Sequence, residues 1–210
     1  MDGGRLGGDH MSRLYIGGSP ISAVYMGGKR YDVKIGYKRK PSSLVYELGE
    51  TTFDGATYID TGINLSTYEQ YTVCLDAQYG DANNIQNMVD WMTENRPYPG
   101  WALDLYNVMR FAVKTPITIA SKTTDRMRYV VRYDGSVYTL FAINAPNGLN
   151  VTNNIATGAI NHTLLVGAYY NNGSINRYVH NGSKIWSFQV YSTALSDQEC
   201  VNYYENGVVS

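Results

Sequence analysis

The stretch YVVRYDGSVYTLF, Tyr129–Phe141, decides the fold of this chain. Two runs rich in β-branched and aromatic residues flank Asp134-Gly135, a dipeptide typical of the tight turn between two antiparallel strands. The stretch therefore predicts a β-hairpin, and the rest of the chain shows whether that hairpin stands in a larger sheet.

Further short apolar and aromatic runs recur along the chain, separated by turn residues. They predict strands at Leu44–Leu48, Tyr58–Ile63, Tyr71–Tyr79, Trp101–Tyr106, Arg110–Val113, Met127–Tyr133, Val137–Asn144, Leu164–Ala168 and Lys184–Tyr191. The 20 Tyr and 21 Gly of the 210 residues fit pleated strands and tight turns. Many short strands at this spacing indicate an all-β, two-sheet sandwich.

One helix is expected near the C-terminus. Ser196 followed by Glu199 forms a capping box, and Cys200 and Tyr203 are spaced to lie on one packed face. Asn206-Gly207 supplies the stop signal. The sandwich is thus expected to carry one short C-terminal helix.

The charge balance excludes several classes of partner. The formal net charge is −1 and 17% of residues are charged, which gives no electrostatic basis for binding nucleic acid or an anionic membrane. No apolar run reaches the length of about 20 residues that a membrane span requires. Cys74 and Cys200 stand far apart and match no metal-binding motif, so we expect neither a disulfide nor a metal cofactor. Partners are expected to be proteins or sugars.

A ten-residue repeat lies near the front, LYIGGSPISA (Leu14–Ala23) followed by VYMGGKRYDV (Val24–Val33). Each copy puts a strand-forming run before a Gly-Gly pair, which predicts a small three-stranded meander over residues 12–35. So few short strands bury too little apolar surface to be stable alone. We therefore expect a docking module whose contacts come from Tyr15, Ile16, Gly17 and Gly18 in the first copy and Tyr25, Met26, Gly27 and Gly28 in the second.

The domain boundaries follow from composition. Residues 1–11 have no apolar pattern and are interpreted as a leader or non-native extension, either upstream of a natural start at Met11 or left by cloning. Residues 36–43 are basic and contain Pro and Ser, as a linker does. The sandwich is expected to cover residues 44–210.

Three segments resemble the laminin-G-like, concanavalin A-like jelly roll of many phage and bacterial surface proteins: Phe53–Ile63, Met127–Phe141 and Gly182–Glu199. The front repeat is similar to short N-terminal modules of phage virion proteins. Together these resemblances imply a phage structural protein, a decoration, fibre or tail component, displayed on the particle surface. They also imply other virion proteins as partners and a homo-oligomeric or multicopy arrangement.

Enzymatic activity is not expected. Sandwich glycanases need paired acids around the glycosidic bond, two or four residues apart on one strand so that they share a face. Glu47 and Glu50 are three residues apart, and Asp90 and Glu94 run into a turn-like segment. A polysaccharide hydrolase is therefore the least favoured class.

Sugar binding is the favoured ligand chemistry, because exposed aromatic rings can stack on pyranose faces. Trp91, Tyr98 and Trp101 bracket a Pro-rich loop, and Trp91 and Tyr98 are the aromatic residues expected to be exposed. Trp101 begins an alternating strand and Trp186 lies inside another, so a core position is favoured over an exposed one for both.

A strand with three arginines is the second candidate. Alternation places Arg126, Arg128 and Arg132 on one face and Met127 and Tyr129 on the other. The arginines could hold an anionic polysaccharide or phosphate, and a solvated outer face paired with acids explains them equally well.

No cofactor is required by these patterns. Ca²⁺ is an alternative because Asp54, Asp60 and Asp81 lie near predicted loops, but acids of solvated turns have the same pattern. The sequence thus favours a non-enzymatic virion protein whose sandwich binds host-surface polysaccharide, and its rival is a purely structural protein that binds no sugar.

Overall fold

The computed structural model describes residues 43–83, 85–92, 100–105, 108–112, 116–121, 123–151, 160, 162–171, 173–176 and 178–209, and four short strands between residues 15 and 32. The chain divides into two compact units, Met1–Arg39 and Lys40–Ser210. Each unit is described by itself.

The N-terminal unit contains two hairpins where the sequence predicted one three-stranded meander. β1 (Tyr15–Ile16) pairs with β2 (Ser19–Pro20), and β3 (Ala23–Met26) pairs with β4 (Lys29–Asp32). The strands on either side of each Gly-Gly pair are partners of each other, Ile16 with Ser19 and Met26 with Lys29. Each copy of the repeat therefore gives a separate pair of strands.

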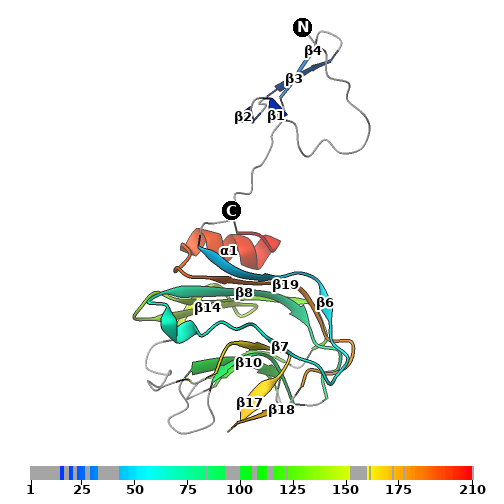
Figure 1. Cartoon of the computed structure of the whole chain (residues 1–210), viewed down its shortest axis with the longest axis vertical. Coiled ribbons are helices and arrows are strands. Elements are labelled where there is room, and N and C mark those ends of the chain that lie inside the picture. The colour runs from blue at the N-terminus through cyan, green and yellow to red at the C-terminus, as the bar shows by residue number, and fades with distance from the viewer. Residues whose placement is uncertain are drawn as a thin grey trace. The chain divides into compact units, whose positions relative to one another are not determined.

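Two antiparallel sheets form the second unit and confirm the predicted all-β sandwich (Figure 1). The six-stranded sheet runs in the order β12 (Ile117–Ala120), β11 (Met109–Ala112), β10 (Gly100–Leu105), β9 (Gln86–Met92), β16 (Leu165–Val166) and β7 (Ile59–Asp60). The seven-stranded sheet runs β15 (Ala145–Val151), β14 (Tyr138–Ala142), β13 (Met127–Tyr133), β8 (Tyr71–Gln78), β19 (Lys184–Tyr191) and β5 (Leu44–Leu48), with β6 (Thr51–Thr52) also pairing with β19.

Three smaller elements complete the unit. A 3₁₀ turn covers Leu65–Thr67, and a hairpin of β17 (Tyr169–Asn171) and β18 (Ser174–Asn176) lies against β9. Helix α1 (Asp197–Asn206) lies on the other side of the molecule, over the seven-stranded sheet (Figure 1). Within the described ranges, no helix has the length and apolarity that crossing a membrane requires.

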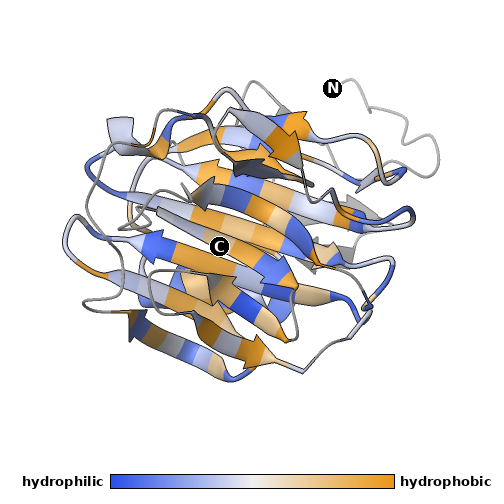
Figure 2. Cartoon of the chain, turned by 90° about the horizontal axis from the view of Figure 1, so that it is seen from below, coloured by the Kyte–Doolittle hydropathy of each residue, from blue (hydrophilic) through white to orange (hydrophobic). Residues whose placement is uncertain are grey.

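The main core lies between the two sheets. Strand alternation sends Met127, Tyr129 and Val131 of β13 into it, as the sequence predicted, while Val130 points to the opposite face. The same alternation appears as changing hydropathy along the strands in Figure 2. The outer face of the seven-stranded sheet is thereby left to polar side chains and to the residues under α1.

The hairpin predicted for Tyr129–Phe141 is confirmed. Tyr133 pairs with Tyr138, and Asp134 Oδ1 accepts hydrogen bonds from the backbone N–H groups of Ser136 and Val137 at 2.9 and 2.8 Å. These bonds, from Val137 first, hold the pKa of Asp134 below its usual value. Gly135 has φ +96°, a conformation that L side chains rarely adopt.

A chain of hydrogen bonds joins aromatic residues of the two sheets. Trp101 Nε1 donates to Tyr71 Oη at 3.0 Å, and Tyr71 Oη donates to Tyr138 Oη at 3.0 Å. Trp101 is fully buried and Tyr71 is 1% exposed, so water cannot replace these partners. These hydrogen bonds fix how the two sheets are placed relative to each other at this end of the core.

Helix α1 begins at the predicted capping box. Ser196 Oγ accepts from the Glu199 N–H, and the Glu199 carboxylate accepts from the Ser196 N–H. Gly207 ends the helix in the left-handed conformation at φ 72°. The helix covers a second apolar cluster on the outer face of the seven-stranded sheet, formed by Cys74, Val130, Phe141, Tyr191, Leu195, Cys200, Tyr203 and Val209.

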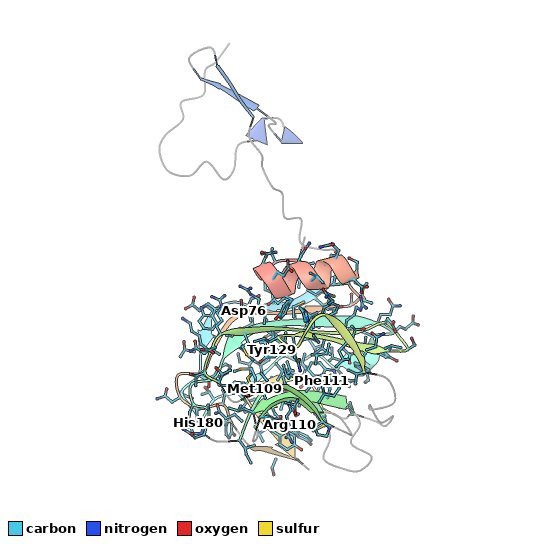
Figure 3. The ribbon with its side chains drawn as sticks, turned by 180° about the vertical axis from the view of Figure 1, so that it is seen from behind. Asp76, Met109, Arg110, Phe111, Tyr129 and His180 are labelled. Carbon is cyan, nitrogen blue, oxygen red and sulfur yellow. The ribbon has the colours of Figure 1, made fainter. Side chains whose placement is uncertain are left out.

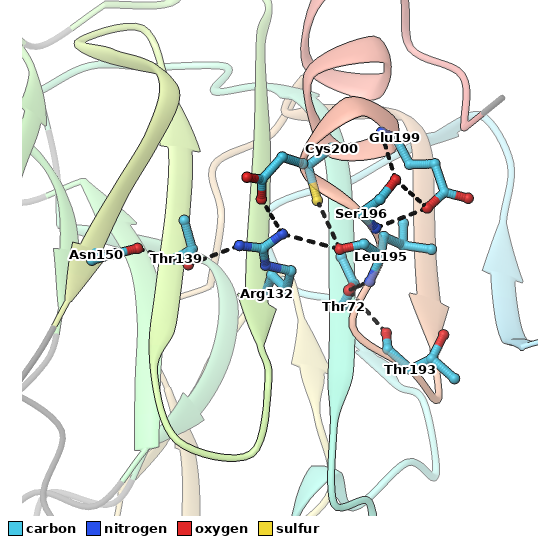
Figure 4. Close-up of polar contacts among 10 residues, drawn as sticks. Thr72, Arg132, Thr139, Asn150, Thr193, Leu195, Ser196, Glu199 and Cys200 are labelled. Carbon is cyan, nitrogen blue, oxygen red and sulfur yellow. Dashed lines mark hydrogen bonds and ion pairs between the residues drawn. The ribbon is translucent and has the colours of Figure 1, made fainter.

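Two arginines of β13 fix the two ends of α1. At its N-terminal end, Arg132 Nη1 donates to the Leu195 carbonyl at 3.1 Å and pairs with the Asp197 carboxylate, while Nη2 donates to Thr139 Oγ1 (Figure 4). At its C-terminal end, Arg128 Nη1 donates to the Glu205 carbonyl at 2.7 Å. A cation at the C-terminal end of a helix also interacts favourably with the helix dipole.

Both cysteines are free and buried, Cys74 on β8 and Cys200 on the packed face of α1. Burial raises the pKa of the Cys200 thiol to about 12 and raises the pKa of Cys74 well above its usual value. Because the thiolate is the reactive form, both thiols are protected while α1 is docked.

The aromatic hydrogen-bond chain gives the first prediction. Tyr71→Phe leaves the buried Trp101 N–H without an acceptor, so we expect it to lower the free energy of unfolding by about 1–3 kcal/mol. Tyr133→Phe is the matched control, because its hydroxyl bonds the Gly135 carbonyl at an exposed position. Urea unfolding of both variants measures the difference, and equal losses would contradict the role of the buried chain.

The arginine contacts give the second prediction. Arg132→Ala removes the bonds at the N-terminal end of α1, so we expect the helix to open more often and Cys200 to react with a thiol reagent about tenfold faster in the folded protein. Lys184→Ala is the control, since it removes a pair with the exposed Glu50 carboxylate and a contact with the Trp186 ring and leaves the bonds of Arg132 in place. An unchanged labelling rate in Arg132→Ala would show that α1 is held without this arginine.

Candidate functional site

Two of the predicted arginines converge on one buried carboxylate at the outer face of the seven-stranded sheet. Arg126 donates from Nε and Nη2 to the two oxygens of Asp76, at 2.6 and 2.7 Å, and Arg128 Nε donates to the same carboxylate at 2.8 Å. The Asp76 side chain is 3% exposed, and it lies on the side of the sheet that faces α1 (Figure 3). Two guanidinium groups are therefore held by one carboxylate that solvent does not reach.

Trp186 supports Arg126 from the other side. The guanidinium carbon of Arg126 lies 4.2 Å from the centroid of the Trp186 ring, and the Lys184 ammonium lies 5.1 Å from it. The register of β19 against β8 shifts between Ile185 and Ser187, which turns half-buried Trp186 to the outer face. Its interpretation as a core residue is therefore wrong.

A pocket of about 380 Å³ lies beside these groups. We call it the helix-edge pocket, and it is lined by Arg126, Met127, Arg128, Ile143, Tyr204 and Glu205. One wall thus comes from β13 and the turn after β14, and the other from the C-terminal turn of α1. The Ile143 side chain is 58% exposed, and Arg126 keeps 46% of its side chain exposed.

The nitrogen atoms of Arg126 differ in whether they bond the described residues. Arg126 binds Asp76 through Nε and Nη2, and its Nη1 bonds none of the described residues. The Asp76 carboxylate raises the pKa of Arg126, so the guanidinium stays charged. The site can therefore offer a rigidly held donor next to aromatic and aliphatic surface.

Sequence reasoning placed the arginines on the correct face but missed Asp76, Trp186, Ile143 and Tyr204. Alternation along β8 puts Asp76 on the face opposite Leu75 and Ala77, which both lie in the core. The signal that could have identified Asp76 was its cross-strand pairing with Arg128. That pairing depends on the register of β8 against β13, which the sequence alone does not give. Arg132 is 15% exposed and does not line the pocket.

The aromatic candidates fall elsewhere. The expectation that Trp91 is exposed is wrong, because its side chain is 5% exposed and packs edge-on against Tyr71. Trp101 is fully buried opposite it, so its ring cannot stack on a sugar. Both rings fill the core because their strands pair there. Tyr98 lies outside the described residues.

Two carboxylates from neighbouring strands lie on the outer face of the six-stranded sheet, although no single strand predicted such a pair. Asp104 of β10 stands opposite Asn87, and Asp90 of β9 stands opposite Ala102, so both acids point away from the core. Asp104 is bound by both arms of Arg110, which is labelled in Figure 3, and Asp90 accepts the Tyr170 N–H at 3.0 Å. They are 4% and 0% exposed, and such buried, engaged carboxylates do not form an accessible acid pair.

Each of the three candidate calcium ligands accepts a hydrogen bond from a backbone N–H group two residues further along its own turn. Asp54 Oδ1 accepts from the N–H of Ala56, Asp60 Oδ1 from that of Gly62, and Asp81 Oδ1 from that of Asn83. In the part of the chain that the structure describes, no three acidic, His or Cys side chains gather as metal ligands do.

The predicted docking residues divide between strands and undescribed positions. Tyr15 and Ile16 lie in β1, and Tyr25 and Met26 lie in β3. Gly17, Gly18, Gly27 and Gly28 fall outside the described residues, so their role in docking stays a prediction.

Comparison by sequence identifies no relative. No protein-family model matches the chain, and no curated protein matches it.

Comparison by structure does find similar folds. A CBM40 domain of the Ruminococcus gnavus IT-sialidase superposes with a TM-score of 0.54 at 18% identity, over 76% of this chain and 98% of that one. A mutant of NanB sialidase from Streptococcus pneumoniae superposes with a TM-score of 0.56 at 14% identity, over 75% of this chain and 27% of that one. A leech intramolecular trans-sialidase gives 0.56 at 16% identity, over 78% and 28%.

The chain thus spans about a quarter of the two sialidases and nearly the whole of the CBM40 domain. At these identities the likeness concerns the fold alone: the β-sandwich of this chain is similar to the fold of the CBM40 domain and to that of part of each sialidase.

Proposed function

We propose that the sandwich is a non-catalytic carbohydrate-binding module and that the helix-edge pocket is its binding site. The observation that carries the proposal is the guanidinium of Arg126, fixed by Asp76 and Trp186 with Nη1 directed to no described partner, beside a pocket of about 380 Å³. Ligand pockets commonly have volumes of about 300–1,000 Å³ and combine apolar walls with a few fixed polar groups. The pocket meets both conditions.

The fold also supports the proposed carbohydrate-binding role. The CBM40 domain of Ruminococcus gnavus has also been solved bound to α2,3- and α2,6-sialyllactose, and this chain covers 99% of it in each case. A binding role for this chain's sandwich agrees with that neighbour, and burial removes Asp90 and Asp104 as an accessible pair of catalytic acids.

The N-terminal repeat supplies the second half of the proposal. We place the protein on the surface of a phage particle, as a decoration, fibre or tail component attached through residues 12–35. Support comes from the similarity of the repeat to phage modules and from its position in a unit separate from the sandwich. Many copies on one particle would turn weak binding to host-surface polysaccharide into strong attachment.

Binding is tested with the full chain on a glycan array and then by calorimetry. Arg126→Ala and Trp186→Ala are each expected to weaken binding about tenfold or more, because they remove the donor and its support. Tyr58→Ala is the matched control, since this aromatic residue is 40% exposed and does not line the pocket. Thermal unfolding of each variant confirms that the sandwich is intact.

The array also decides between a carbohydrate-binding module and a purely structural protein that binds no sugar. Silence of a multivalent preparation on every glycan would favour a purely structural protein. Release of reducing sugar from host polysaccharide would instead establish a hydrolase.

Attachment is tested by deleting residues 12–35. We expect the sandwich to stay folded, because its two sheets use no strand of the repeat, while the protein no longer purifies with particles. Circular dichroism and particle sedimentation measure the two outcomes. Unfolding of the sandwich on deletion would show that the repeat belongs to its core.

A further inference from the structure

The charges around the helix-edge pocket cancel. Arg126 and Arg128 bring two positive groups, and Asp76 and Glu205 bring two negative ones. The next ion pair along the sheet, Lys184 with Glu50, is also balanced. The carbonyl end of α1 adds partial negative charge, and Arg128 is already bonded to it through the Tyr204 and Glu205 carbonyls.

An acidic ligand would meet two obstacles in this pocket. The oxygens of Asp76 already receive three charged N–H groups, at 2.6, 2.7 and 2.8 Å, and with 3% of the side chain exposed Asp76 cannot move out to solvent. A carboxylate or sulfate would have to share those arginines with Asp76. It would also lie near the Glu205 carboxylate, which repels it.

A neutral sugar meets neither obstacle. Arg126 Nη1 is a donor that bonds none of the described residues, and the Glu205 side chain is an exposed acceptor that receives no hydrogen bond from them. A hydroxyl group both accepts and donates, so one hydroxyl of a sugar can bind Arg126 while another binds Glu205. Tyr204 and Ile143 provide apolar surface for the carbon skeleton.

We infer that the helix-edge pocket binds neutral sugars through their hydroxyl groups and discriminates against acidic ones. The inference rests on the proposed function and adds its ligand class. Arg128 acts as a positioning residue, because it holds Asp76 and the end of α1, whereas Arg126 and Glu205 contact the ligand.

The test compares acidic probes with uncharged counterparts. The full chain is titrated with oligogalacturonic acid and with its methyl ester, and with 3′-sialyllactose and lactose, and a glycan array extends the comparison to other neutral and acidic sugars. We expect the neutral member of a pair to bind about tenfold more tightly or better than the acidic one. Its affinity should hardly change between about 50 and 300 mM NaCl, since no net charge is neutralised.

Glu205→Lys is the decisive variant. It replaces the acceptor by a cation, so the preference should reverse toward the acidic probe and become salt-sensitive, while Glu205→Gln should only reduce the discrimination. Glu69→Gln is the control, because Glu69 is exposed and lies outside the pocket. These variants change exposed side chains and leave the buried Asp76 contacts in place.

The outcomes distinguish the preference for neutral sugars from sugar binding itself. Tighter or equal binding of acidic probes, or array signals confined to acidic glycans, would overturn the inference while keeping the proposed function. Absence of binding to every probe by a multivalent preparation would overturn both.

Discussion

The carboxylate of Asp76 is the interaction on which the outer face of the sandwich depends. It lies on β8, and its two arginine partners lie at and just before the start of β13, so it fixes side chains across the centre of the seven-stranded sheet. Removing a buried ion-pair partner costs far more than the pair itself contributes, because it leaves an uncompensated charge. Through Arg128 the same carboxylate orients the group that binds the end of α1. The Asp76 carboxylate therefore helps to hold the sheet, the end of α1 and one wall of the pocket in place.

Much of the fold could be predicted from local patterns. The hairpin around Asp134, the capping box at Ser196, and the faces of β13 depend on neighbours within a few residues, and the structure confirms each of them. Strands such as β9 were missed, because Gln86–Met92 is buried on both faces and shows no alternation of apolar and polar residues. The number of strands in the N-terminal repeat was also wrong, since local patterns do not fix which strands pair.

The candidate site was predicted only in part, for the same reason. Strand alternation placed Arg126 on the outer face, but its partners come from β8 and β19, and that proximity follows from strand order and register. The bulge beside Trp186 moved a ring that simple alternation placed in the core. Burial of Trp91 and Trp101 follows from their direct pairing across β9 and β10, which residue spacing alone does not reveal.

The position of α1 in the chain has a consequence for synthesis. Every strand of the sandwich precedes Asp197, so a ribosome can supply both sheets before it supplies Tyr204 and Glu205. A nascent or clipped chain that stops short of the helix would contain all the strands but only one wall of the pocket. Ligand binding would then distinguish molecules that contain α1 from molecules that contain every strand but lack the helix.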